Sequence, residues 1–323
     1  MKIINLRISL LVYLSGIICL CNAEDVNKQC FSYKNISYEY TRPNFLTPFK
    51  RVLPDYGEYF GLFRKKETLI TYSIVAVSTA ALIYYDQELL DGAKELGDEL
   101  NINSEDLTRP FISIGDIQIF RGPTDLGSAM YFIGDGWLHG SMMAGFLTYG
   151  LIKDNNRALQ TGSQLAEGLI TTGIATQLLK HITGRQSPYR STEDGGSWDF
   201  FPDQIEYHKH VPQYDAFPSG HLATAMMTFT VITENYPEYN YWAKPLGWTL
   251  LGLLSYQMMN NGVHWAGDYP LAIAIGYGFG KIAVDNGRTI IASDKVNNTM
   301  EFMPVYKNNA IGFGFVYNFF NNN

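Results

Sequence analysis

The chain has 323 residues, of which 46% are hydrophobic and 14% aromatic, so it can bury a large core and is not a disordered protein. Its net charge of -7, with no Lys- or Arg-rich run, argues against a nucleic-acid-binding protein. Any anionic ligand would therefore need a local cluster of cations.

The N-terminus has the pattern of an export signal. Two basic residues precede an apolar run over residues 8–21, which is shorter than the about 20 apolar residues of a membrane span. Because small Ala23 supplies a cleavage point, residues 1–23 are predicted to be a signal peptide, with an uncleaved anchor helix as the alternative. The mature protein would then be exported to the periplasm or cell envelope. It would retain only Cys30, so no intrachain disulfide is expected.

Residues 24–126 form an N-terminal region with one apolar helix. Prolines scattered between residues 30 and 66 predict irregular structure that covers a core. Residues 68–85 are uncharged and of helical length, which fits either a membrane span or a buried helix. A mean hydropathy of -0.09 is low for a protein with several lipid-facing helices, so we favour a buried or membrane-apposed bundle.

Five helices are predicted in residues 127–287, which form the catalytic domain in this interpretation. Their expected ranges are 128–152, 157–180, 219–236, 245–259 and 268–284. Glycines spaced along the last of them allow close contact between helices. The long segment 183–217 is rich in Gly, Ser, Pro and charge, which is typical of a functional or disordered loop.

Residues 288–323 form a tail of different character. Apolar residues alternate on both sides of residues 307–309, which predicts a β-hairpin. An outer-membrane anchoring strand is the alternative for this segment. The predicted fold class is therefore all-α, with a helical-bundle core, an irregular N-terminal region and a short C-terminal β-hairpin.

The sequence Phe217–His221 has the features of a phosphate-binding helix start. Ser219 is a suitable N-cap, and Gly220 allows a ligand to approach the backbone. The free N–H groups and the positive end of the helix dipole bind phosphate, and His221 lies in the same first turn. In the alternative interpretation Ser219 only caps the helix and His221 is a surface residue.

Two further segments carry charged and titratable residues. Lys180 and Arg185 flank the end of one predicted helix and can neutralise phosphate oxygens, although cations there commonly just offset the helix dipole. His264 and Asp268 share a face if their segment is helical. The carboxylate would then orient the imidazole as a nucleophile, although such pairs are more often structural.

In this order and spacing, the three segments resemble the type 2 phosphatidic acid phosphatases, a superfamily that includes bacterial acid phosphatases and vanadium haloperoxidases. The resemblance covers residues 127–284 and implies a helical bundle. It also implies that His264 attacks phosphorus to give a phosphohistidine, that Asp268 orients His264, and that His221 is the general acid. Phosphate would be held by Lys180, Arg185 and the backbone at Ser219 and Gly220.

Two positions depart from the family pattern. Ser187 and Met258 stand where the family has phosphate-binding arginines, and each loss removes charge-assisted hydrogen bonds worth about 1.5–3 kcal/mol. The hydroxyl of Ser187 itself, the guanidinium of Arg190 and the amide of Asn261 are candidate replacements. Asn260 is a neighbouring alternative to Asn261.

Three other functions compete with an exported phosphatase. The loss of arginines also fits a protein that binds a phosphate ligand without hydrolysing it, and it disfavours a vanadium haloperoxidase, which must retain its oxyanion. A purely structural envelope protein is the third. No cofactor or metal is expected, because the carboxylates are not clustered and His208 and His210 lack nearby ligands. The predicted partner is a phosphorylated lipid or a small phosphate ester, and the sequence makes no prediction of oligomeric state.

Overall fold

A computed structural model describes residues 27–34, 36–114, 117–293, 300–307 and 310–317. The predicted signal peptide, residues 1–23, lies outside these residues, so export stays a prediction. The chain forms two units. The larger contains Tyr40–Thr289, and the smaller contains Cys30–Glu39 and the described residues after Thr289.

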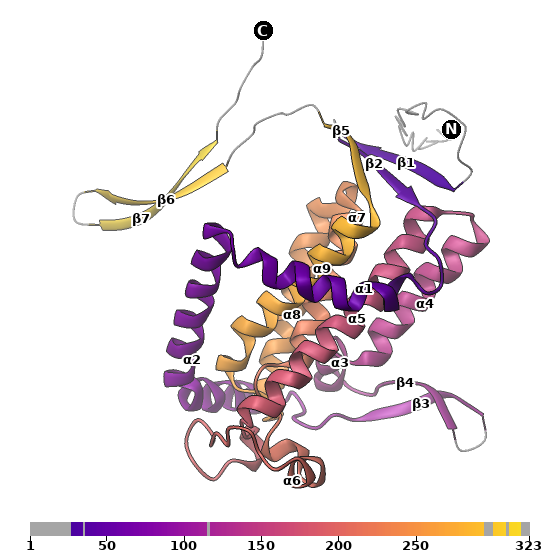
Figure 1. Ribbon diagram of the computed structural model, residues 1–323. Helices are drawn as coiled ribbons and strands as arrows, with labels where there is room; N and C mark the ends of the chain where they lie inside the picture. Colours follow the sequence, from indigo (N-terminus) through magenta and orange to yellow (C-terminus); the bar gives the residue numbers. More distant parts are fainter. Residues whose placement is uncertain (1–26, 35, 115–116, 294–299, 308–309, 318–323) are drawn as a thin grey trace, which may run out of the picture. The chain divides into compact units, whose positions relative to one another are not determined.

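The described helices all belong to the larger unit, and the predicted all-α class is confirmed (Figure 1). They are α1 (Thr47–Leu62), α2 (Lys66–Glu99), α3 (Leu126–Phe132), α4 (Gly136–Ile152), α5 (Asn156–Thr183), α6 (Gln204–Lys209), α7 (Gly220–Asn235), α8 (Asn240–Asn260) and α9 (Tyr269–Gly287). Helix α7 packs against α5 and α9, and α4 packs against α5. Helix α2 packs against α8, α9 and the short 3-10 turn η4 (Ala266–Asp268).

Local signals in the sequence set the helix ends around the predicted loop. The side chain of Asn155 accepts a hydrogen bond from the N–H of Ala158 at 2.8 Å and so begins α5. Gly184 ends α5 in the left-handed conformation, with φ 52°. Ser219 begins α7, since its Oγ accepts a hydrogen bond from the N–H of Leu222 at 3.3 Å. The segment between these ends contains one short α-helix, α6, and two short 3-10 turns, Pro188–Arg190 and Val211–Gln213.

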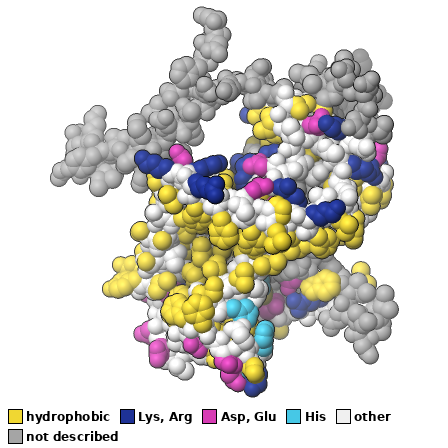
Figure 2. Space-filling model, in the orientation of Figure 1, with side chains coloured by type: hydrophobic (Ala, Val, Ile, Leu, Met, Phe, Trp, Pro, Cys, Tyr) yellow, Lys and Arg dark blue, Asp and Glu magenta, His cyan; other side chains and the backbone are white. Residues whose placement is uncertain are grey.

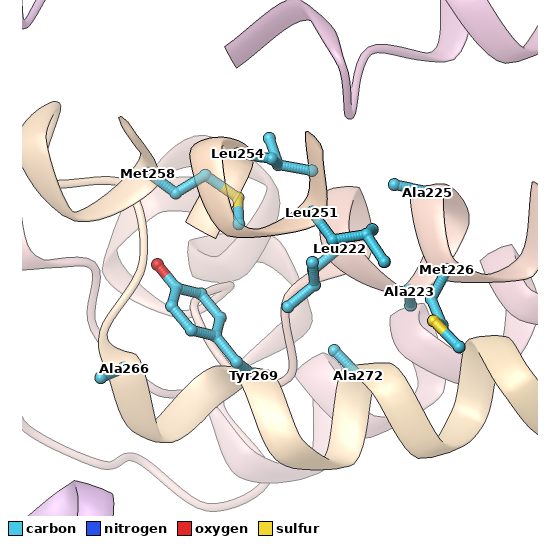
Figure 3. Packing of buried hydrophobic residues seen from close by; sticks show 10 residues of the cluster. All are labelled: Leu222, Ala223, Ala225, Met226, Leu251, Leu254, Met258, Ala266, Tyr269 and Ala272. Atoms are coloured by element: carbon cyan, nitrogen blue, oxygen red, sulfur yellow. The ribbon is translucent and has the colours of Figure 1, made fainter. Parts of the chain in front are cut away.

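A buried apolar cluster joins α7, α8 and α9 (Figure 3). The labelled residues in that view are Leu222, Ala223, Ala225, Met226, Leu251, Leu254, Met258, Ala266, Tyr269 and Ala272. Helices α7 and α9 approach closely because Gly276 lacks a side chain: a Cβ there would lie 2.2 Å from the carbonyl oxygen of Ala223. Close contact through the glycines of the last helix, as predicted, is therefore present.

The helix expected over residues 128–152 is two helices, α3 and α4. Asp135 interrupts it, because its carboxylate accepts a hydrogen bond from the N–H of Trp137 at 2.7 Å and begins a new helix. Asp125 caps α3 in the same way, accepting from the N–H of Ser128 at 3.0 Å. Two capping carboxylates thus replace the single helix start that the apolar pattern predicted.

The N-terminal region contains more regular structure than its prolines indicated. Pro48 lies in the first turn of α1, where its missing N–H leaves no hydrogen bond unmade. The predicted apolar helix 68–85 is only the first half of α2. A hairpin of β3 (Thr108–Ile114) and β4 (Ile117–Pro123) follows. Helix α8 also starts before its predicted position, with Pro245 inside it.

The remaining strands form two small sheets. One has the order β1 (Lys28–Tyr33), β2 (Ile36–Thr41), β5 (Thr289–Ser293). The other is the antiparallel pair β6 (Met300–Lys307) and β7 (Ala310–Tyr317), which confirms the predicted C-terminal hairpin. Cys30 is disulfide-bonded, contrary to the expectation that it stands alone. That expectation assumed the removal of the chain's other cysteines with residues 1–23.

Candidate active site

The two predicted catalytic histidines lie side by side in the larger unit. His221 is in the first turn of α7, and His264 is in the extended stretch between α8 and η4. Their ring centroids are 6.1 Å apart, with the ring planes at 70°. The fold thus brings together two histidines that are 43 positions apart in the sequence.

The imidazole of His264 is fixed in one orientation and is only 2% exposed. Its Nδ1 lies 2.8 Å from the carbonyl oxygen of Ala216 and 3.3 Å from Oδ2 of Asp268. Because a carbonyl oxygen only accepts hydrogen bonds, Nδ1 carries the proton and Nε2 keeps its lone pair. This arrangement is what a nucleophilic imidazole needs.

The contact between His264 and Asp268 forms without the predicted helix. Helix α8 ends at Asn260, and Gly262 turns the chain with a positive φ of 65°. A short 3-10 turn then returns Asp268 toward the histidine. The pairing was therefore predicted correctly from the spacing, but the turn and not a helical face brings the two side chains together.

Arg185 does not have the phosphate-facing position that the sequence suggested. It is fully buried, with Nη1 donating to Oδ1 of Asp268 at 2.7 Å. Its Nη2 donates to Oδ2 of Asp86 at 2.5 Å and to the carbonyl of Gly195 at 2.8 Å. Since both terminal nitrogens are bound within the protein, Arg185 supports the carboxylate behind His264. Its partner Asp86 lies 99 residues earlier, and no local pattern pointed to it.

Lys180 and the start of α7 form the cationic side of the site. Lys180 is 5% exposed, and its Nζ lies 3.5 Å from Oδ2 of Asp215. A Cβ on Gly220 would lie 3.8 Å from this Nζ, so the ammonium group is next to the helix start. Among the described residues, no acceptor is bound to the N–H groups of Gly220 and His221. Together with the helix dipole, these groups can bind an oxyanion.

Ser219 supports this helix start but has no free donor for a ligand. Its N–H donates to the carbonyl of Asp268 at 3.1 Å. Its Oγ accepts from Leu222 and lies 3.5 Å from Sδ of Met258. The capping interpretation therefore holds for Ser219, and the direct contact with phosphate that we predicted for its backbone is not supported.

Tyr131 of α3 is a site residue that the sequence did not reveal. Its hydroxyl lies 3.1 Å from Nε2 of His221, from 90 residues earlier in the chain. Desolvation, together with smaller contributions from His264 and Lys180, lowers the pKa of His221 to about 3. No local pattern marks Tyr131, because its role depends on how α3 packs beside α7.

The candidate replacements for the missing arginines have different environments. Of the two positions where the family has arginine, Met258 is completely buried in the core cluster and Ser187 is 2% exposed. Arg190 is exposed, lies against the ring of Tyr189 and lines a separate polar cavity of about 440 Å³. The side-chain amide of Asn261 is buried, and both its nitrogen and its oxygen lack a partner within the described chain. Asn261 is therefore the candidate with an unused donor.

His208 and His210, the two histidines of the long loop, have other contacts in the structure. His208 is exposed and packs beside His181 and Tyr207. His210 is paired with Glu206 at 3.7 Å. Across the described ranges, no three His, Cys, Asp or Glu side chains come together in a way that could hold a metal ion.

Comparison with known proteins identifies the segment that carries this site. Residues 162–289 match the family model of the PAP2 superfamily. The match includes Lys180, His221, His264 and Asp268, and it starts later than the resemblance from residue 127 that the motifs indicated. Neither the curated proteins nor the solved structures give a significant match.

Proposed function

Because residues 162–289 belong to the PAP2 superfamily, we propose that this protein is an exported phosphatase that hydrolyses phosphate esters through a phosphohistidine. The observation that carries this proposal is the pairing of His264 and His221. One imidazole has its Nδ1 held by the Ala216 carbonyl at 2.8 Å, and the other faces it across 6.1 Å. A nucleophile and a general acid need this arrangement.

The proposed reaction has two steps. Nε2 of His264 attacks phosphorus while the bond to the ester oxygen breaks, and His221 gives its proton to the leaving alkoxide. Water then attacks the phosphohistidine, His221 takes a proton from it, and the bond between phosphorus and Nε2 breaks to release phosphate. Lys180 and the N–H groups of Gly220 and His221 offset the charge on the other phosphate oxygens. The unpartnered amide of Asn261 is a further donor for them.

We propose that the substrate is a lipid phosphate at a membrane surface. Helix α2 is the one helix in the described ranges long and apolar enough to cross a membrane, and none of its apolar window is buried. Exposed Arg64 and Lys65 precede it, and exposed Tyr84 and Tyr85 follow its apolar half, as at membrane interfaces. Figure 2 shows hydrophobic side chains gathered in a broad band beneath a row of Lys and Arg. A soluble phosphate ester is the alternative substrate.

Phosphate release by the full-length protein tests this function. The substrates would be a long-chain lipid phosphate in mixed micelles and a soluble aryl phosphate, compared between wild type, His264→Ala and the exposed control His208→Ala. We expect wild type and His208→Ala to release phosphate, and His264→Ala to lose nearly all of the rate. Acid quenching should trap an acid-labile phosphoprotein in wild type only.

A negative result would bear on the alternative function, which is phosphate binding without hydrolysis. If no substrate gives phosphate above the His264→Ala background, catalysis is wrong. Binding of inorganic phosphate by an inactive wild type would then support a non-catalytic phosphate-binding protein. That outcome would fit the small number of cations that the structure brings to the site.

A further inference from the structure

A buried chain of charged side chains connects α2 to the candidate nucleophile. Arg185 joins Asp86 of α2 to Asp268, at 2.5 Å and 2.7 Å, and all three side chains are 0% exposed. Asp268 in turn lies 3.3 Å from Nδ1 of His264. The order of contacts is therefore Asp86, Arg185, Asp268, His264.

Asp86 also fixes the backbone of the turn that carries Asp268. Its Oδ1 accepts a hydrogen bond from the N–H of Gly267 at 2.7 Å. Gly267 has no side chain to keep α2 away: a Cβ there would lie 2.9 Å from Oδ2 of Asp86 and 2.7 Å from Cγ1 of Ile83. One carboxylate thus binds both the guanidinium and the turn.

The guanidinium between the two carboxylates has little freedom to move. It lies 4.8 Å from the ring centroid of Trp198 and 5.3 Å from that of Trp265. Trp265 is itself fixed, because its N–H donates to Oδ2 of Asp268 at 2.8 Å and its indole Nε1 donates to the carbonyl of Gln186 at 2.7 Å. With Oδ1 of Asp268 bound to Arg185, Oδ2 is left to face His264.

We propose that Asp86 and Arg185 are positioning residues for His264: they hold Asp268 in the orientation that keeps the imidazole ready to attack phosphorus. This inference rests on the proposed phosphatase function. It replaces the phosphate-binding role suggested for Arg185 by its sequence position. It also gives α2 a role in the site, although α2 lies outside the matched segment 162–289.

The test uses Asp86→Asn, which keeps the shape of the side chain and removes its charge. Asp55→Asn is the matched control, since Asp55 is an equally buried carboxylate of α1 that binds Asn286 and not the site. Two readouts are needed: kcat and KM for phosphate release, and the titration of the His264 ring followed by NMR, assigned with His264→Ala.

We expect Asp86→Asn to lower kcat by about 10- to 100-fold with little change in KM. Replacing a residue that orients a metal ligand has an effect of this size. The titration midpoint of His264 should move in Asp86→Asn but not in Asp55→Asn. Asp86→Glu, which keeps the charge, should recover part of both effects. A folded Asp86→Asn protein with wild-type kcat and an unmoved His264 titration would overturn the inference.

A second variant and a readout that is independent of turnover keep the result interpretable. If Asp86→Asn does not fold, Arg185→Lys retains the buried cation and loses the paired geometry; unchanged kcat and titration in that folded variant would also overturn the inference. The NMR readout needs no turnover. A wild type that releases no phosphate would therefore contradict the proposed function, while a His264 titration that moves in Asp86→Asn would still support the link.

Discussion

The two histidines are similar residues in different environments. His264 has Nδ1 bound to a carbonyl oxygen and a carboxylate, so its ring orientation and tautomer are set. Within the described part of the chain His221 has no carboxylate partner, and its Nε2 contacts the Tyr131 hydroxyl at 3.1 Å. Desolvation lowers the pKa of His221 to about 3, which disfavours its charged form. Because His264 has the carboxylate contact, it is the proposed nucleophile, and His221 is the proposed acid.

This assignment predicts a pH dependence. A general acid must be protonated, and the protonated fraction of His221 falls as pH rises above its lowered pKa. We expect kcat/KM to fall between pH 5 and pH 8 in wild type. His221→Gln should be slower by about 100-fold or more and should show a weaker dependence on pH. Equal slopes in both proteins would contradict the assignment, because the ionisation of the substrate is common to the two.

The lowered pKa of His221 also affects the stability of the folded protein, even without substrate. The unfolded chain binds a proton on this histidine near pH 6.5, whereas the folded protein does so only near its lowered pKa. Folding is therefore penalised as pH drops below about 6.5. His221→Gln lacks this contribution, so chemical denaturation should show a smaller loss of stability between pH 7 and pH 4 than in wild type.

At the scale of elements, the site depends on how closely α7 and α9 approach. The N–H of Ser219, before α7, binds the carbonyl of Asp268, before α9, at 3.1 Å, so the starts of the two helices are joined. Further along α9, Gly276 and Gly280 lie against the backbone of α7. Small residues in α9 thus set the distance between the helix starts that carry His221 and Asp268.

Two glycine substitutions distinguish the effect of this close packing on stability from the effect of helix propensity. Gly276→Ala places a Cβ 2.2 Å from the backbone oxygen of Ala223, which cannot move aside as a side chain would. We expect it to lower the free energy of unfolding by about 1–3 kcal/mol or more. Gly252→Ala, on the exposed side of α8 with nothing within 4 Å, should be neutral or stabilising by up to about 1 kcal/mol. Equal effects in thermal unfolding would contradict the close-packing argument.

At the scale of the larger unit, large apolar side chains of α2 and α8 are exposed. Leu69, Ile74 and Val77 of α2 are between 50% and 70% exposed. On α8, Tyr241 is 82% exposed and Trp248 52% exposed. On the face shown in Figure 2, hydrophobic side chains gather in a broad band. Continuous apolar surface of this kind is typical of proteins that contact a membrane or a partner.

Vesicle binding tests the membrane interpretation. The variant Ile74→Lys with Val77→Lys puts two charges into the apolar half of α2, at a cost of about 2.5–3.5 kcal/mol each within a bilayer. We expect its partitioning into anionic phospholipid vesicles to be at least about tenfold weaker than that of wild type. Ile205→Lys is the control, since Ile205 is 66% exposed on α6, in the long loop. Equal binding by all three proteins, or none by wild type, would contradict the proposal.

The sequence by itself determined the helical class, the start of α7 at Ser219, the C-terminal hairpin and the residues of the two histidine motifs. Each of these follows from local signals: a capping hydroxyl, an alternating apolar pattern, or titratable residues at short spacing. Local signals predicted the wrong structure at two places. At Asp135 a cap interrupts an apolar run, and at Pro48 a proline fits the first turn of a helix.

The tertiary structure alone decided which charged groups meet. Asp86 and Arg185 are 99 residues apart, and Tyr131 and His221 are 90 residues apart, so no spacing rule connects them. A buried guanidinium needs carboxylates within hydrogen-bonding distance, and only the packing of α2 on the turn before α9 supplies the second one. The motifs therefore pointed to the candidate nucleophile His264, while the long-range packing showed that Arg185 is bound behind it and that Lys180 lies beside the start of α7.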